Sequence, residues 1–279
     1  MLKIGVIGHG AIAQFVARAL PKINAQLVLV IARPGRFDAA RAALGTSQGA
    51  TQETTQETTQ GAELQVVERL GDMRPDVVVD CAGHSGLQQH GVEILRAGVP
   101  LITVSIGALA DQSLQDKLIE AARSGRTTLR LSSGAIGSLD AIASARYGDL
   151  KTVTYTGRKP PGGWKGSHAE QVVNLDDMGD CSVTHFEGSA RDAALLYPKN
   201  ANVAAAVALA GLGFDNTRVR LIADPTVNVN IHEIHATGDF GEMQFSILGK
   251  TLPDNTRTSA LAAMSVVKML SDQSACITF

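Results

Sequence analysis

The sequence has few cysteines, few aromatic residues and no excess of charge of one sign. Its three cysteines are far apart and odd in number, which excludes the disulfide framework of a small secreted domain and a Cys-x-x-Cys metal site. With 25 Lys and Arg against 27 Asp and Glu, the net charge of -2 offers no basic surface for nucleic acid or an anionic membrane. We therefore expect a cytoplasmic protein whose partner is a small molecule.

Long hydrophobic runs are also missing. The longest uncharged apolar stretch, residues 203–214, is shorter than the roughly 20 residues that a membrane-spanning helix needs. The N-terminus reads directly as a strand, without the basic region, apolar segment and cleavage site of a secretory signal. Hydrophobic residues at 44% suffice for a sizeable core, and 28 glycines with 4% aromatics favour an α/β enzyme over a β-sandwich.

The first half of the chain alternates between short apolar runs and segments with helical spacing. This alternation predicts βαβ units, and hence an α/β fold with a Rossmann-type, doubly wound parallel sheet. The repeat of Thr, Gln and Glu at 51–60 contains no apolar residue and is predicted to be a surface insertion. The expected strands are 2–7, 26–31, 64–67, 77–80, 100–104 and 127–131, and the expected helices are 11–20, 36–44, 87–97 and 111–123.

After residue 134 the pattern becomes that of a second, smaller α+β domain. We therefore predict a dinucleotide-binding domain of residues 1–133 plus 252–279, and a substrate domain of residues 134–251. Within the second half we expect strands around 153–155, 219–221 and 227–234, helices at 192–196, 201–212 and 259–270, and a Gly/Pro-rich loop at 159–166.

A GxGxxA motif stands between the first expected strand and the first expected helix. Gly8 permits a tight turn, Gly10 lets a pyrophosphate approach the backbone, and the small Ala13 allows close packing of helix and strand. The helix N-terminus attracts the phosphates. The motif predicts that Gly8, Gly10, Ala11 and Ile12 contact a dinucleotide.

Two further strand ends carry cofactor candidates. Arg33 follows the second strand, where an acidic residue would select NAD, and an arginine there accommodates the 2′-phosphate of NADP. We expect NADP or NAD as the cofactor. If Arg33 does not contact the cofactor, it is a solvated charge in a loop. Cys81 and Ala82 follow the fourth strand and are predicted to lie near the nicotinamide ribose. Cys81 is either a nucleophile or an inert buried thiol.

The segment 227–236 alternates polar and apolar residues, as a half-buried strand does. The alternation changes phase after His232, which predicts a β-bulge there. His235 lies three positions on and faces the other side of a regular strand, so the two histidines form no metal site. His232 is either a structural or a catalytic histidine.

Two helix N-termini offer groups that bind anions. Lys199, Asn200 and Asn202 precede an alanine-rich helix, where they either bind a carboxylate or an amide or simply cap the helix. The segment Asn255-Thr-Arg-Thr-Ser259 stands in the same relation to the last helix.

Over almost its whole length the chain resembles the L-aspartate dehydrogenases. The resemblance is carried by the glycine motif and by the segments 133–141, 197–207 and 230–234, the last followed by Gly-Asp-Phe-Gly at 238–241. The family's catalytic histidine matches His232, and its cofactor-contacting alanine and asparagine match Ala135 and Asn202. Before the last helix, this chain has Thr256 and Arg257 where the family often has proline and lysine.

The resemblance implies oxidative deamination of L-aspartate with NADP or NAD, and the reverse reductive amination. It also implies that the product, iminosuccinate, is hydrolysed to oxaloacetate and ammonia or enters NAD biosynthesis. By analogy with the family we expect a homodimer. Two substrate carboxylates need cationic or helix N-terminal partners, for which Lys199, Thr258 and Ser259 are the candidates. His232 suits acid–base chemistry because its unperturbed pKa, about 6.5, lies near neutral pH.

Two other functions are alternatives to aspartate oxidation. A sugar or inositol dehydrogenase of the related two-domain type carries Glu-Lys-Pro after the fifth strand, and here Ile-Gly-Ala follows residues 99–105 instead. A redox sensor that binds NADP without catalysis is the third reading. His232 and Lys199 beside the predicted cleft argue against it.

Overall fold

The computed structural model describes residues 1–45, 63–253 and 255–278, without the side chains of residues 256 and 257. The predicted insertion at 51–60 lies outside the described residues. The chain forms two compact units. Unit 1 comprises Met1–Ser105, Asp116–Ser132 and Val266–Phe279, and unit 2 comprises Ile106–Gln115 and Ser133–Ser265. The domain boundaries expected from the sequence, 1–133 plus 252–279 and 134–251, stay a prediction.

Unit 1 contains a six-stranded parallel sheet with the strand order β3-β2-β1-β4-β5-β6. This is the order of a dinucleotide-binding Rossmann sheet, so the predicted α/β class is confirmed. The strands end within one or two residues of the expected positions, and the central strands β4 and β5 are short, mostly apolar runs buried along their whole length. They are β1 (Leu2–Ile7), β2 (Ala25–Ile31), β3 (Gln65–Val67), β4 (Val77–Asp80), β5 (Leu101–Thr103) and β6 (Leu129–Leu131).

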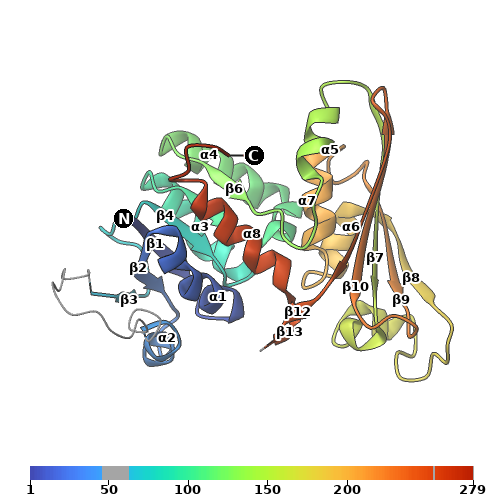
Figure 1. Cartoon of the computed structure of the whole chain (residues 1–279), viewed down its shortest axis with the longest axis horizontal. Helices are drawn as coiled ribbons and strands as arrows, with labels where there is room; N and C mark the ends of the chain where they lie inside the picture. Colours follow the sequence, from blue (N-terminus) through green and yellow to red (C-terminus); the bar gives the residue numbers. More distant parts are fainter. Residues whose placement is uncertain (46–62, 254, 279) are drawn as a thin grey trace. The chain divides into compact units, whose positions relative to one another are not determined.

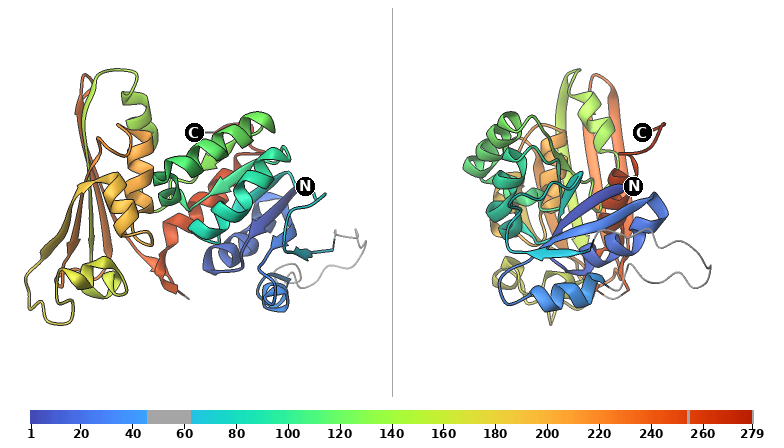
Figure 2. Two further views of the ribbon diagram at one scale, coloured as in Figure 1. Left: turned by 180° about the vertical axis from the view of Figure 1, so that it is seen from behind. Right: turned by 90° about the vertical axis from the view of Figure 1, so that its left-hand side faces the viewer.

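Helices cover both faces of this sheet (Figures 1 and 2). One face packs against α1 (Ala11–Ala19) and the end of α8 (Ala260–Ser271), whose Val266 and Leu270 join the same buried cluster as Val16 and Ile4. The other face carries α3 (His84–Arg96) and α4 (Gln112–Ser124). In the described residues of unit 1, the other helices are η1 (Leu20–Ile23) and α2 (Phe37–Leu44).

Unit 2 contains a five-stranded mixed sheet in the order β11-β10-β7-β9-β8, in which only β7 and β9 pair in parallel. The strands are β7 (Leu150–Lys159), β8 (Val183–Ser189), β9 (Arg218–Ala223), β10 (Asn230–Gly238) and β11 (Gly241–Gly249). The helices are η3 (Ile106–Ala110), α5 (Leu139–Ala145), η4 (Pro161–Trp164), η5 (His168–Gln171), α6 (Ala190–Leu196) and α7 (Asn202–Ala210), and a short hairpin of β12 (Thr251–Leu252) and β13 (Asn255–Ser259) precedes α8.

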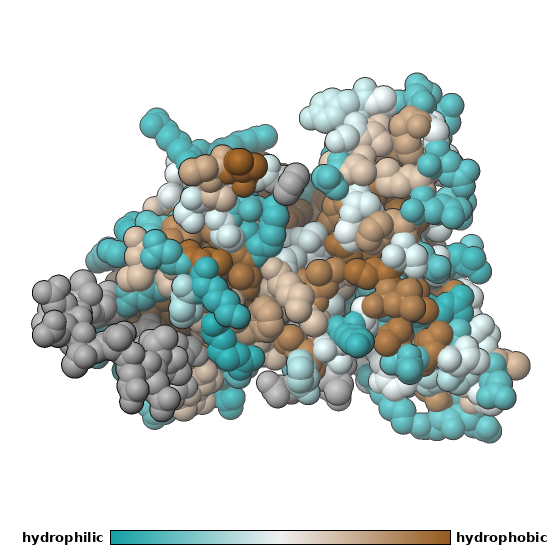
Figure 3. Space-filling view, viewed as in Figure 1, coloured by the Kyte–Doolittle hydropathy of each residue, from teal (hydrophilic) through white to brown (hydrophobic). Residues whose placement is uncertain are grey.

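The two faces of this sheet differ in their surroundings. The helices α6 and α7 lie on one face, which we call the covered face (Figure 1). Val153, Val219 and Leu221 point to it and are almost completely buried. The opposite, outer face carries exposed Arg218 and Arg220, and hydrophilic residues line this margin of the unit in Figure 3. The covered face is therefore the one that can shield buried polar chemistry from water.

Strand β10 corrects the expectation for residues 227–234. It begins at Asn230 and pairs with β11 and β7 without interruption as far as Thr237, so the bulge predicted at His232 is wrong. The apparent change of phase has a simpler cause. His232, Ile234 and Ala236 share the covered face and all three are buried, so a histidine occupies a position where the pattern would place an apolar residue.

Candidate functional site

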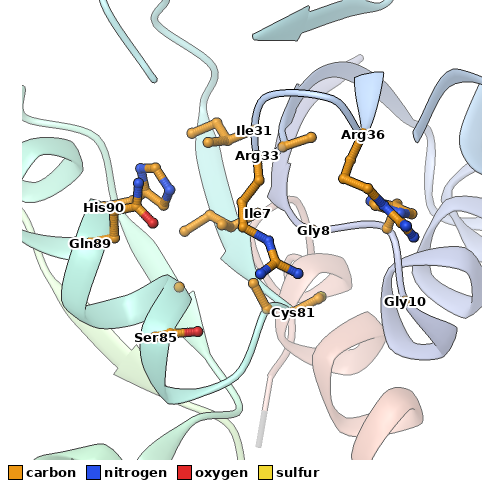
Figure 4. A pocket seen from close by; sticks show the side chains of 14 residues that line it. Ile7, Gly8, Gly10, Ile31, Arg33, Arg36, Cys81, Ser85, Gln89 and His90 are labelled. Atoms are coloured by element: carbon orange, nitrogen blue, oxygen red, sulfur yellow. The ribbon is translucent and has the colours of Figure 1, made fainter. Parts of the chain in front are cut away.

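A cavity opens at the carboxyl ends of β1, β2 and β4 in unit 1, the edge at which such sheets bind ligands (Figure 4). It brings together five of the residues predicted to bind the cofactor. Ala11 and Ile12, the first two residues of α1, are not among its lining residues. The lining comprises Ile7, Gly8, His9, Gly10, Ile31, Ala32, Arg33, Arg36, Cys81, Ala82, Ser85, Gly86, Gln89 and His90.

The glycine loop has the geometry that a diphosphate requires. Gly8 has φ +85° and donates its N–H to the Ile31 carbonyl at 2.8 Å, and a Cβ on it would lie 3.1 Å from Cβ of Ala82. Gly10 precedes α1, and a Cβ built on it would meet no atom within 4 Å. The open space at Gly10 and the uncapped start of α1 fit the pyrophosphate of a dinucleotide.

Two arginines provide positive charge at one end of this cavity. Figure 4 shows Arg33 and Arg36 beside the glycine loop, with Ser85 and His90 of α3 across the cavity. Burial lowers the pKa of His9, and the charges of Arg36 and Arg33 lower it further. None of the lining residues is acidic. Arg36 was missed by the sequence analysis because it follows the strand end by five residues, although its charge and its place before a helix were visible.

The loop after β4 is held by a buried carboxylate. Asp80 accepts hydrogen bonds from the hydroxyls of Thr103 at 2.7 Å and Ser105 at 2.6 Å, and from the Ala82 N–H at 3.0 Å. Burial raises the pKa of Asp80 and, together with the charge of Asp80, raises the pKa of the Cys81 thiol. Cys81 therefore stays protonated, which favours the inert thiol over the nucleophile.

His232 lies on the covered face of unit 2, opposite Gly157 of β7. Its Nδ1 atom is 2.7 Å from the Tyr155 hydroxyl, and only 4% of the residue is exposed. A Cβ on Gly157 would lie 2.7 Å from that hydroxyl oxygen, so glycine is the residue that leaves room for the pair. His235 faces the outer side, as predicted, and binds Glu242 at 2.8 Å.

The environment changes the acid–base properties expected of His232. Burial, and then the charge of Lys159, lower its pKa to about 4, so the imidazole is neutral at neutral pH.

Within the described parts of the chain, no three His, Cys, Asp or Glu side chains come together in an arrangement that could hold a metal ion.

Lys159 is a cation that the sequence analysis assigned to a loop. It is the last residue of β7 and points to the covered face, because it continues the alternation of Val153, Tyr155 and Gly157. Its Nζ donates to Asn200 Oδ1 at 2.7 Å and lies 4.7 Å from the centre of the Trp164 ring. Burial lowers its pKa to about 8. The period-2 alternation was the signal that could have found it.

A second histidine–tyrosine pair lies on the same face. His185 Nδ1 is 3.0 Å from the Tyr197 hydroxyl, and the His185 ring packs edge-on against Trp164 with 4.4 Å between centroids. Burial, Lys159 and His168 lower the pKa of His185 to about 4. The covered face thus holds two neutral histidines around one lysine.

The other predicted site residues also have defined places. Asn202 is the first residue of α7, and its side-chain oxygen accepts the Gly107 N–H at 2.8 Å. Ala135 is buried in the turn before α5. Thr258 and Ser259 end β13, directly before α8, and Lys199 is exposed between α6 and α7. Their contacts with cofactor or substrate stay predictions.

Comparisons with known proteins cover both halves of the chain. Residues 4–132 match the family model "Homoserine dehydrogenase, NAD binding domain", and residues 140–273 match "Aspartate dehydrogenase, C-terminal".

No helix in the described part of the chain combines the length and apolar character needed to cross a bilayer.

Relatives of known name are similar over the full length. The L-aspartate dehydrogenase of Ruegeria pomeroyi is 54% identical over 99% of this chain and 94% of its own, and that of Cupriavidus necator is 44% identical over 100% of both. Among solved structures, aspartate dehydrogenase from Thermotoga maritima has the same fold, with a TM-score of 0.71 at 22% identity over 100% of this chain and 99% of its own. On this evidence the chain belongs to the L-aspartate dehydrogenase family.

Proposed function

We propose that the chain carries out the NAD(P)-dependent oxidation of L-aspartate, with His232 as its acid–base group. The observation that carries this assignment is the buried pair of His232 and Tyr155, 2.7 Å apart, on the same sheet face as the Lys159 ammonium. A titrating group, a hydrogen-bond partner that orients it, and a cation are what an amino acid with two carboxylates requires.

Unit 1 supplies the cofactor site. When bound, the nicotinamide accepts the hydride that leaves Cα of the substrate. The space at Gly10 and the N-terminus of α1 receive the pyrophosphate, and Arg33 with Arg36 receives the 2′-phosphate. We infer a preference for NADP over NAD, supported by these two arginines and by the acid-free lining of the cavity.

His232 manages the protons of the reaction. The substrate ammonium must lose a proton before hydride can leave Cα, and a neutral imidazole is able to accept it. Loss of the hydride gives iminosuccinate. His232 then passes this first proton to solvent and is neutral again. Water adds to the C=N bond, His232 takes a proton from this water and returns it to the departing nitrogen, and ammonia leaves as the hydroxyl proton goes to solvent, which gives oxaloacetate. Tyr155 orients the imidazole throughout by its hydrogen bond to Nδ1.

Ala135 and Asn202 are proposed to contact the cofactor, as the family resemblance implies, and Lys199, Thr258 and Ser259 are proposed to contact the substrate because its two carboxylates need a cation or a helix N-terminus. Asn202 supports this role because its side chain already fixes the backbone of Gly107. We further propose that the enzyme is a cytoplasmic homodimer with no nucleic-acid or membrane partner, and that its iminosuccinate supplies NAD biosynthesis. Light scattering of the purified chain tests the dimer.

The assay that tests the function follows absorbance at 340 nm. Aspartate with NADP should raise the absorbance, and oxaloacetate with ammonia and NADPH should lower it, with the NADP pair turned over more efficiently than the NAD pair. Alanine in place of aspartate is the control for the second carboxylate. If the wild-type chain changes the absorbance in neither direction with either cofactor, the proposed function is wrong.

A further inference from the structure

The ammonium of Lys159 is half-buried among neutral partners. It contacts the side-chain oxygen of Asn200 and the ring of Trp164, and no carboxylate in the described residues lies within salt-bridge distance of it. Two exposed lysines of unit 2 pair with acids, Lys151 with Asp149 and Asp239 and Lys165 with Asp176. A cation withdrawn from water without a counter-ion destabilises a fold, so a lysine held in this way suits a site where a ligand supplies the anion.

The position of this ammonium fits one end of a short dicarboxylate. His232 of β10 is opposite Gly157 of β7 on the covered face, and Lys159 lies two residues beyond Gly157 on β7, about 7 Å from Gly157 at the Cα level. A Cβ on Gly163 would lie 3.2 Å from Lys159 Cβ and 3.8 Å from Asn230 Oδ1. Gly163 therefore leaves space between the lysine and an amide that is able to donate a second hydrogen bond.

We propose that Lys159 binds the side-chain carboxylate of the substrate and thereby makes the site selective for amino acids with a second carboxylate. This inference rests on the proposed function and assigns a contact within its site. Asn200 holds the ammonium in place, and His232, on the neighbouring strand opposite Gly157, acts on the nitrogen-bearing carbon. Lys159, rather than the exposed Lys199, is then the residue that distinguishes aspartate from alanine.

A pair of inhibitors isolates this contact. Succinate and butyrate have four carbons each and differ in one carboxylate, which butyrate replaces by a methyl group. Calorimetric titration of the NADP-loaded enzyme should give a succinate affinity roughly tenfold or more above that of butyrate, the value of one charge-assisted contact. The fluorescence of Trp164, the single tryptophan of the chain, should report succinate binding independently, because the Lys159 ammonium lies over its ring.

Variants then identify the residue. Lys159→Met should remove the preference for succinate and leave butyrate binding unchanged, whereas Lys159→Arg should keep most of it. Lys165→Met is the matched control, since this exposed lysine is next to Trp164 in sequence and pairs with Asp176. A preference that survives in Lys159→Met, or one that Lys199→Met removes instead, overturns the proposal.

A measurement on the wild type covers the case in which Lys159→Met does not fold. The preference for succinate should fall as pH rises from 8 to 10, because the ammonium then loses its proton while both succinate carboxylates stay ionised. His232 and His185 have pKa values of about 4 and have already lost their protons in this range, and burial raises the pKa of Tyr155 and Tyr197, so these hydroxyls keep theirs. A constant preference across this range overturns the proposal. An enzyme that prefers succinate through Lys159 but does not oxidise aspartate refutes the proposed function and leaves this site standing.

Discussion

The hydroxyl of Tyr155 and Nδ1 of His232 lie 2.7 Å apart on the covered face of the second sheet. Burial raises the pKa of Tyr155, and burial together with Lys159 lowers that of His232 to about 4. Both groups are therefore neutral across the physiological range. The hydrogen bond from the Tyr155 hydroxyl group involves only Nδ1 and orients the imidazole. The other ring nitrogen, Nε2, is therefore the atom available for proton transfer.

The role of Tyr155 as a positioning residue predicts a specific kinetic change. Tyr155→Phe should lower kcat about tenfold, because the imidazole loses the hydrogen bond that orients it, while NADP affinity stays unchanged. The acid limb of the pH–rate profile should also shift, which a purely structural loss would not cause. Tyr147→Phe is the control, since Tyr147 is 97% exposed. Equal kinetics for both variants would refute this role.

Replacement of His232 tests the acid–base assignment directly. His232→Asn should fold and bind NADP like the wild type, with kcat lowered by about 10²–10⁴-fold, as for removal of a general acid–base group. His235→Asn removes a histidine from the same strand but from its outer face, and should cost little. Stopped-flow and steady-state rates at 340 nm measure turnover in both variants. Near-native turnover in His232→Asn would make this histidine a packing residue.

The glycine loop permits a contrast between two substitutions that look alike in sequence. Gly10→Ala should leave the thermal midpoint nearly unchanged, because its Cβ meets no atom within 4 Å, yet weaken NADP binding by filling the space proposed for the pyrophosphate. Gly8→Ala should lower the free energy of unfolding by about 1 kcal/mol or more, since φ is +85° and Ala82 is 3.1 Å away. Calorimetry of unfolding and NADP titration separate the two effects, and tight NADP binding by Gly10→Ala would contradict the placement.

Cofactor preference should depend on both cavity arginines. Arg33→Asp should weaken NADP binding roughly tenfold or more, since a charge-assisted contact to the 2′-phosphate is lost, and weaken NAD binding much less. Arg36→Ala should act in the same direction. Arg41→Ala, on the exposed side of α2, provides the control. The ratio of kcat/KM for the two cofactors is the measurement, and an equal loss for NADP and NAD would count against the placement.

The sequence predicted unit 1 better than unit 2 for a physical reason. Strands β1 and β4 are buried on both faces, so composition alone marks them, and the glycine motif stands beside them in the chain. Helix α3 begins three residues before the expected Leu87, because Gly83 has φ +76° and His84 and Ser85 carry no apolar signal.

In unit 2 the functional side chains come from strands and loops that are distant in sequence. Lys159 and Asn200 meet only because β7 ends beside the loop between α6 and α7. The sequence predicted no strand at β8 or β11, so it could not place His185 next to Trp164. It identified His232 as a candidate but not Tyr155 as its partner, because the pairing depends on the register of β10 with β7.

The two buried histidines of unit 2 predict how stability changes with pH. The pKa values of His185 and His232 are about 4 in the native state, whereas the unfolded chain takes up these protons near pH 6.5. The stability they contribute is therefore complete above pH 6.5 and is lost as pH falls toward 4. At pH 5 the loss is roughly 2 kcal/mol for each histidine. Urea denaturation at pH 7 and pH 5 measures it.

Replacement of one buried histidine should remove its share of this pH dependence. In His185→Asn, the difference in unfolding free energy between pH 7 and pH 5 should shrink by about 2 kcal/mol, whatever the variant costs at pH 7, because the contribution of His185 is gone and that of His232 remains. His235→Asn, on the outer face, should leave the difference as in the wild type. A His185→Asn protein with the full wild-type difference would mean that His185 accepts a proton in the native state, and that the cluster around Lys159 opens to water between pH 7 and pH 5.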